Sequence, residues 1–314
     1  MNKDYLKQVF SRLPDCEAWT LQIIQVKNSV GDRISYVCRE IQLDPVERLL
    51  DYIENISNYY CSANGIDDFT SVDNYTGDVV GHVIYKLEKT NQLISHEYEI
   101  LIQSTSSPDR ETPIKDIKPN AAIFKGTVNL PSSDVSGNED VPVMLVSMQK
   151  PMTALSNKFL MTSTGKFHEI DAPVLSLRKT MDVAIIGNNV YLFTLAGEKL
   201  FNMERTYRAV CKAKVDEIIK CDFLSDNDGF ITYANSGRNP RRFVSYNNSH
   251  YEWLKIQANR QKAAEIFGLE IIDGSIKTDD IISVEKLVKF LCNKAMLDPC
   301  DDSPVEVAST KPWR

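Results

Sequence analysis

The sequence lacks the features that would place the chain in a membrane, secreted or disulfide-rich class. No apolar run approaches the roughly 18–20 residues that a membrane-spanning helix needs. The first residues, Met1 to Tyr5, include no apolar stretch typical of a signal peptide. The 7 cysteines form no C-x-x-C pair, and their odd number disfavours a disulfide framework. We therefore expect a reduced, cytoplasmic protein.

Sequence motifs for common cofactors and catalytic sites are also missing. The glycines form neither a G-x-G-x-x-G motif nor a P-loop, and no G-x-S-x-G elbow is present. The 4 histidines are far apart and lack the spacing of metal ligands. We therefore predict no cofactor, no metal site and no enzymatic activity. One alternative is a metal-dependent nuclease using Asp109 and Asp116 with Lys118, although such acids usually lie on neighbouring strands and not in a proline-rich loop.

The charge of the chain is segregated along the sequence. The net charge is −7, which by itself argues against a nucleic-acid partner. Residues 1–150 contain 14 Lys+Arg and 22 Asp+Glu, and residues 263–314 contain 6 and 10. In contrast, residues 151–262 contain 16 Lys+Arg and 11 Asp+Glu. A basic middle between two acidic ends indicates a local binding surface that the mean charge conceals.

The N-terminal part alternates between strand and helix patterns. Residues 19–27 and 32–39 are apolar and β-branched, which predicts two paired strands with a turn at 29–32. Residues 44–62 predict an amphipathic helix, capped by Asp44 and with its apolar side chains at helical spacing. The segment 93–104 fits either a helix or a strand, and we favour a strand. The proline-containing stretch 104–119 is the best linker candidate.

The C-terminal part predicts a mostly antiparallel sheet followed by helices. Short apolar runs predict strands at residues 121–128, 141–148, 158–162 and 174–177, and a hairpin at 182–193 around Gly187. Helical patterns follow at 198–219, 239–267 and 280–297. We therefore predict an α+β fold. Residues 1–118 would form a mixed N-terminal α/β region, and residues 119–314 a sheet with basic C-terminal helices, the basic segment being 199–262.

Two basic segments are the strongest functional feature. Arg205, Arg208 and Lys212 share one face if residues 198–219 are helical, and Arg238, Arg241 and Arg242 surround a loop that enters the next helix. Arg and Lys side chains neutralise phosphates and release counterions, so we predict that these six residues contact nucleic acid. Aromatic residues interleaved with the basic ones would stack on bases: Tyr233, Phe243, Tyr246, Tyr251 and Trp253. The alternative is a solvated basic surface with the aromatic residues in the core.

The hairpin and the helix after it resemble the KwaB-like family. The resemblance rests on the run MDVAIIGNNVYLFTLAGEKLF at residues 181–201, on the helical segment 198–220, and on FLCNKAMLDPC at 290–300 before a short extended tail. An N-terminal α+β region also precedes them, so the resemblance covers nearly the whole chain in order and length. Its motifs are hydrophobic patterns without a catalytic signature.

The resemblance implies a cytoplasmic subunit of the Kiwa anti-phage defence system. The family is taken to work with KwaA, a small multi-span membrane protein that would recruit it to the inner membrane. It is also expected to bind DNA, to block phage replication or expression, and to form a homodimer or higher homo-oligomer. We therefore expect a DNA-binding effector. The alternatives are a metal-dependent nuclease and a non-catalytic scaffold or adaptor for the membrane partner.

Overall fold

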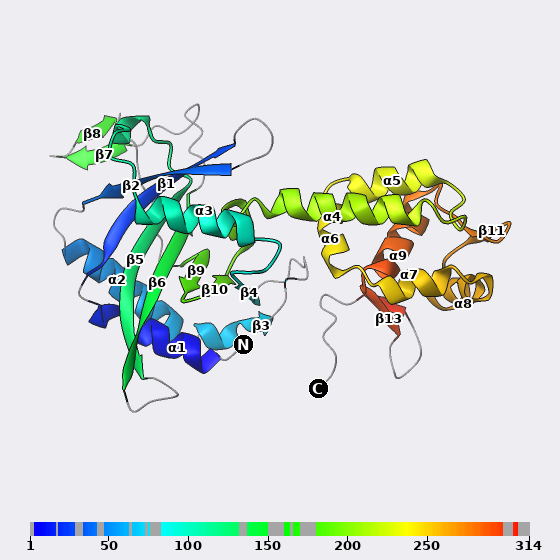
Figure 1. Ribbon diagram of the computed structural model, residues 1–314, viewed down its shortest axis with the longest axis horizontal. Coiled ribbons are helices and arrows are strands. Elements are labelled where there is room, and N and C mark those ends of the chain that lie inside the picture. Colours follow the sequence, from blue (N-terminus) through cyan, green and yellow to red (C-terminus); the bar gives the residue numbers. More distant parts are fainter. Residues whose placement is uncertain are drawn as a thin grey trace. The chain divides into compact units, whose positions relative to one another are not determined.

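A computed structural model of the chain confirms the predicted α+β class (Figure 1). The contacts divide the chain into two compact units, one of Met1–Asn74 with His82–Asn202 and one of Tyr75–Gly81 with Met203–Arg314. The structure describes residues 3–16, 18–28, 34–42, 47–62, 65–72, 75, 83–131, 137–149, 160–163, 166–169, 180–297 and 304–306.

The first unit is built on a mixed but mostly antiparallel sheet in the order β2-β1-β5-β6-β9-β10-β4-β3. All neighbouring strands pair antiparallel except β3 and β4, which run parallel. The strands are β1 Thr20–Asn28, β2 Ile34–Ile41, β3 Thr70–Val72, β4 Val83–Glu88, β5 Ala121–Pro131, β6 Asn138–Met148, β9 Val183–Ile186 and β10 Asn189–Leu192. A separate small hairpin consists of β7 Leu160–Ser163 and β8 Lys166–Glu169.

Two predicted strand pairs are confirmed. Strand β1 pairs with β2, and β9 pairs with β10. Gly187 has a φ of +57° between β9 and β10, a conformation that glycine adopts at little cost in a tight turn. The predicted turn at 29–32, the cap at Asp44 and the strand at 174–177 lie outside the described residues.

The helices of the first unit cover both faces of its sheet. Leu21 of β1 lies in one core with α1 Lys3–Ser11 and α2 Glu47–Cys61. Its neighbour Gln22 donates a hydrogen bond of 3.0 Å to the carbonyl oxygen of Thr105 in α3 Ser95–Ser106. Because adjacent residues of a strand point to opposite faces, α3 covers the other face of the sheet.

The strand that we favoured at 93–104 is wrong, since α3 occupies this segment. Tyr98, Leu101 and Thr105 are buried, and their spacing of three to four residues is that of one helix face. Helix α3 packs on β2. The residues after it, within the predicted linker, are joined to the same strand by a hydrogen bond of 2.7 Å from the Asp109 amide to the Cys38 carbonyl oxygen.

The second unit is mainly helical. Its helices are α4 Met203–Ile218, α5 Asn227–Asn235, α6 Asn239–Arg242, α7 Asn248–Leu254, α8 Gln257–Phe267 and α9 Ile281–Leu291. Two short antiparallel ladders accompany them: β11 Ile271–Ile272 with β12 Ser275–Ile276, and β13 Ala295–Leu297 with β14 Pro304–Glu306. The core includes Phe223, Phe230, Phe243 and Leu287. Each such side chain, once fully buried, contributes roughly 1.5–3 kcal/mol of transfer free energy.

Two boundaries differ from the sequence-based expectation. The helix predicted at 198–219 begins at Met203, because Asn202 has a φ of 45° and the preceding Leu195–Lys199 form a 3-10 turn. The compact units divide at Asn202, whereas the predicted boundary after residue 118 separates β1 from β5, which pair in one sheet. Among the described residues, none of the helices is both long and apolar enough to span a bilayer.

Candidate nucleic-acid interface

Helix α4 presents three of the predicted phosphate-binding side chains to solvent. Its inner face is apolar, and Arg205, Arg208 and Lys212 lie on the exposed side. The Arg208 Nε and Nη2 atoms lie 2.8 and 2.7 Å from the Glu204 Oε1 atom. Both side chains of this pair are about half exposed, at 49% and 60%, so water and salt screen it. A phosphate at this position would therefore compete with Glu204 for Arg208.

The second basic segment is a short helix with a glycine before it. Gly237 has a φ of +54°, and Arg238 follows as the exposed first residue of the turn into α6. Arg241 is half-buried, and its guanidinium carbon lies 5.6 Å from the centre of the Tyr207 ring on α4. This distance is that of a cation–π contact. The Tyr207 ring thus holds Arg241, a residue of the second basic segment, against helix α4, which carries the first basic segment.

Arg242 points toward the interior of the second unit. It lowers the pKa of Glu285 on α9, although the hydrogen bond from Lys289 contributes more to that shift. Burial raises the pKa of Tyr233, and Arg242 opposes this effect. The Nη1 atom of Arg242 is buried and finds no hydrogen-bond partner among the described residues. The charge of Arg242 therefore acts on Glu285 and Tyr233 inside the second unit, while its Nη1 donor has no hydrogen-bond partner among the described residues.

The two basic segments share one region of the second unit. Helix α4 packs against both α6 and the 3-10 turn Phe243–Ser245 that continues it. Of the six predicted residues, the structure exposes Arg205, Arg208, Lys212 and Arg238, and half-buries Arg241 and Arg242. The region brings positive charge from two sequence-distant segments together.

The aromatic residues of this region are mostly committed to packing. Phe243 and Tyr251 are 1% and 2% exposed, so their faces are closed to a nucleobase. Trp253 packs against Phe290 at 5.9 Å between ring centres. Tyr246 carries Lys214 at 4.9 Å from its ring centre, and burial raises the pKa of its hydroxyl. The core alternative is thus confirmed for Phe243 and Tyr251, and the region is suited to phosphates more than to unstacked bases.

Asp109, one of the two acidic residues considered for a nuclease, forms hydrogen bonds within a local turn. The Asp109 Oδ1 atom accepts hydrogen bonds from the amides of Glu111 and Thr112, at 2.7 and 3.2 Å, and its Oδ2 atom accepts one from the Thr112 hydroxyl. These bonds lower the pKa of Asp109. Its carboxylate therefore stabilises a turn. In the part of the chain that the structure describes, no three His, Cys, Asp or Glu side chains lie close enough together to hold a metal ion.

Tyr207 is the residue of this region that the sequence did not single out. It occupies an inward position of α4, between Met203 and Cys211, and is 8% exposed. An aromatic residue at such a position is typical of a core side chain. Only the packing of α6 on α4 reveals that its ring supports Arg241.

A comparison with models of known protein families found a match over residues 145–297. This segment contains all six residues that we predicted to contact nucleic acid. This segment matches the family model described as "Kiwa protein KwaB-like". No curated protein and no solved structure matched the chain. The resemblance inferred from the hairpin and its following helix is therefore confirmed over this segment.

Proposed function

We propose that this protein is the DNA-binding effector of a Kiwa anti-phage defence complex, because residues 145–297 match the KwaB-like family model. The family match indicates a component of the Kiwa system. Within that system we propose that the protein acts in the cytoplasm, forms a homodimer or higher homo-oligomer, and is recruited to the inner membrane by KwaA. It would act by binding DNA and not by catalysis, and so block phage replication or expression.

One observation carries the DNA-binding proposal: the basic side chains of α4 and of the α6 segment lie in one region although the whole chain is acidic. Arg205, Lys212 and Arg238 are exposed there and would each neutralise a backbone phosphate. The region offers no zinc finger or other base-reading motif, so binding would follow the phosphate backbone with little sequence preference. Buried Phe243 and Tyr251 favour duplex DNA over unstacked single strands.

The test is a titration of a fluorescent DNA duplex with the full chain over a series of salt concentrations. We expect the logarithm of the binding constant to fall linearly with the logarithm of salt concentration. Reversing Arg205, Lys212 and Arg238 to Glu should reduce the steepness of that line by about 2–3, since each lost phosphate contact accounts for about 0.9. A binding constant independent of salt would contradict the proposal.

A matched variant controls for the change in net charge. Arg48, Lys89 and Lys118 are exposed in the first unit, and their reversal to Glu alters the charge of the chain by the same amount. We expect this control to keep most of the affinity, and an equal loss in both variants would place binding elsewhere. Supercoiled plasmid incubated with excess protein and Mg²⁺ or Mn²⁺ should stay intact, and cleavage would favour the nuclease alternative.

A further inference from the structure

We propose that the end of the second unit where α5 and α9 begin is a docking surface for a basic, partly apolar segment of a partner protein. This surface, the acidic end, consists of Asp226, Asp228, Glu270, Lys277, Asp279, Asp280, Ile281 and Ile282. It uses none of the residues of the proposed DNA interface, so the two proposals are independent.

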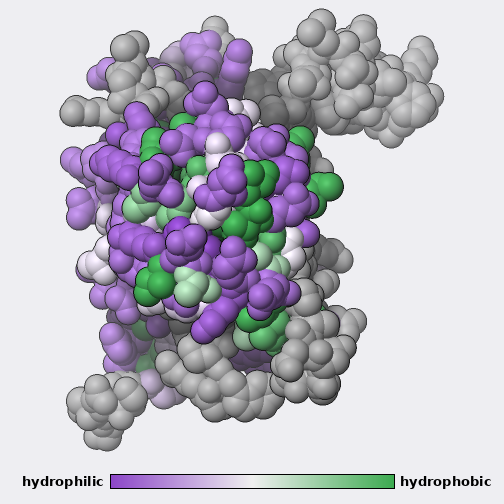
Figure 2. All heavy atoms as spheres, turned by 90° about the vertical axis from the view of Figure 1, so that its right-hand side faces the viewer, coloured by the Kyte–Doolittle hydropathy of each residue, from purple (hydrophilic) through white to green (hydrophobic). Residues whose placement is uncertain are grey.

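Two adjacent isoleucines supply the apolar part of the acidic end. Ile281 and Ile282 are 72% and 69% exposed at the start of α9, whereas the next positions of this helix, such as Val284 and Leu287, are buried. Single exposed apolar residues are common and need no explanation, whereas two adjacent large ones form a continuous apolar surface that is solvated poorly by water. Figure 2 shows the side of the structure that lies at the right of Figure 1, where small groups of hydrophobic side chains are surrounded by hydrophilic ones.

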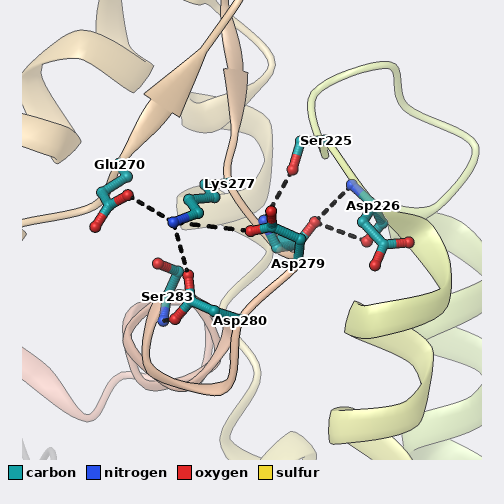
Figure 3. Close-up of polar contacts among 8 residues, drawn as sticks. Ser225, Asp226, Glu270, Lys277, Asp279, Asp280 and Ser283 are labelled. Carbon is teal, nitrogen blue, oxygen red and sulfur yellow. Dashed lines mark hydrogen bonds and ion pairs between the residues drawn. The ribbon is translucent and has the colours of Figure 1, made fainter.

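Carboxylates surround Lys277 (Figure 3), and two of them, Asp279 and Asp280, directly precede the isoleucines in the sequence. The Lys277 Nζ atom lies 3.0 Å from Glu270 Oε2, 3.3 Å from Asp280 Oδ2 and 3.9 Å from Asp279 Oδ1. Hydrogen bonds to Glu270 and Asp280 raise the pKa of Lys277, so its charge persists at neutral pH. One lysine cannot neutralise three carboxylates. Glu270 and Asp279 keep 63% and 57% of their side chains exposed and are available to an incoming cation.

The start of α5 adds two more carboxylates next to this group. Asp226 caps α5 by accepting hydrogen bonds from the amides of Asp228 and Gly229. The buried hydroxyl of Thr278 accepts from the Asp226 amide at 2.8 Å and donates to the Asp226 carbonyl oxygen at 2.7 Å. Thr278 immediately precedes Asp279, so these bonds hold the starts of α5 and α9 side by side. The acidic end therefore has five carboxylates and one lysine.

Close backbone packing keeps this arrangement fixed before any partner arrives. A Cβ atom on Gly229 would lie 2.3 Å from the Thr278 carbonyl oxygen, so only glycine fits at this contact. Lys286, one turn after Ile282, donates to the Gly268 carbonyl oxygen at 2.8 Å and ties α9 to the end of α8. A surface that is already ordered loses little conformational entropy on binding.

The negative charge of the acidic end favours a positively charged partner. DNA and anionic lipid are repelled by five carboxylates, whereas Lys or Arg side chains are attracted to them. Two exposed isoleucines require apolar side chains on the same partner segment. A protein segment that carries Lys or Arg beside Leu, Ile or Val fits both requirements.

The experiment uses the full chain and a fluorescein-labelled helical peptide of 14 residues that contains only Leu and Lys. Its counterpart, in which Glu replaces Lys, reports non-specific apolar binding. We expect the Lys peptide to bind and the Glu peptide not to bind. Ile281→Ser with Ile282→Ser should weaken binding roughly tenfold or more, because the contact area of two isoleucines is lost. Asp279→Lys should also weaken binding of the Lys peptide, and this loss should be larger at low salt than at high salt.

Leu50→Ser is the matched control, since Leu50 is 45% exposed on α2 of the first unit. It should bind the Lys peptide as the wild type does. Equal affinity of all variants, or equal binding of the Glu peptide, would overturn the proposal. A second copy of the chain is the other molecule that could cover the acidic end, and light scattering of the wild type and the double isoleucine variant tests this. If the variant is monomeric and the wild type is not, the acidic end binds a second copy of the chain and the proposal is wrong.

Discussion

The guanidinium of Arg241 lies over the ring of Tyr207, with 5.6 Å between the guanidinium carbon and the ring centre. This contact joins α6 to α4 and so brings together two basic segments that are separated in the sequence by all of α5. The electron-rich face of an aromatic ring attracts a cation and so holds the guanidinium at this position. The position of Arg241 at the proposed DNA interface therefore depends on an aromatic ring that itself contacts no phosphate.

Replacing Tyr207 by Leu should weaken DNA binding about twofold to fivefold, because a cation–π contact contributes about 0.5–1 kcal/mol at such a site. Tyr207→Phe keeps the aromatic face and should bind nearly as the wild type does. Fluorescence anisotropy with a labelled duplex measures both, and thermal unfolding monitored by circular dichroism checks that each variant is folded. Equal losses in the Leu and Phe variants would show that the hydroxyl, and not the ring face, matters.

Glu204→Gln should strengthen DNA binding by roughly threefold to tenfold at 0.1 M salt, since it frees Arg208 and removes one repulsive charge. The salt dependence should become steeper by about 0.9, the contribution of one further phosphate contact. The structural reason is the pair between Glu204 and Arg208, with an Nη2–Oε1 distance of 2.7 Å. Glu54→Gln, an exposed position of α2, is the charge-matched control and should leave affinity unchanged.

The sequence predicted the elements whose signals are local. The hairpin at 182–193 was predictable because Gly187 marks a turn between two apolar runs. Helix α9 was predictable from its apolar spacing, although it ends at Leu291 because Asn293 has a φ of 57°. In contrast, α3 was missed because its pattern combines a buried Glu97 with an apolar run that also suits a strand.

Contacts between distant segments were not predictable from one sequence. The segregation of charge indicated a basic region, and the structure places α4 against α6. The sequence could not tell which of the cations lie on the surface, and Arg242 lies partly inside because Glu285 and Tyr233 surround it. Nor could it separate stacking aromatics from core aromatics, since Phe243 and Tyr251 have the same spacing in both interpretations.

Gly229→Ala should destabilise the second unit by about 1–3 kcal/mol, the usual cost of overpacking a tight contact. The added Cβ atom would lie 2.3 Å from the Thr278 carbonyl oxygen, and neither backbone can retreat without breaking the bonds between Thr278 and Asp226. Gly137→Ala is the matched control, because nothing lies within 4 Å of its added Cβ atom. Urea unfolding followed by tryptophan fluorescence compares them, and equal stabilities would contradict the close packing of α5 and α9.

Asp280→Asn should lower the free energy of unfolding at pH 6. The difference from the wild type should become smaller as the pH falls below 4. The Ser283 amide and hydroxyl hold the pKa of Asp280 down to about 2, with a smaller contribution from Lys277. An unfolded aspartate titrates near 3.9. Its folded pKa is therefore depressed, so the ionised carboxylate stabilises the native state fully above the unfolded value and loses this effect as the pH falls toward 2. Urea unfolding midpoints of both proteins between pH 6 and pH 2.5 measure the difference. Since Asn is also a good N-cap, a difference that stays constant over this range would mean that capping geometry, and not the charge on Asp280, stabilises the start of α9.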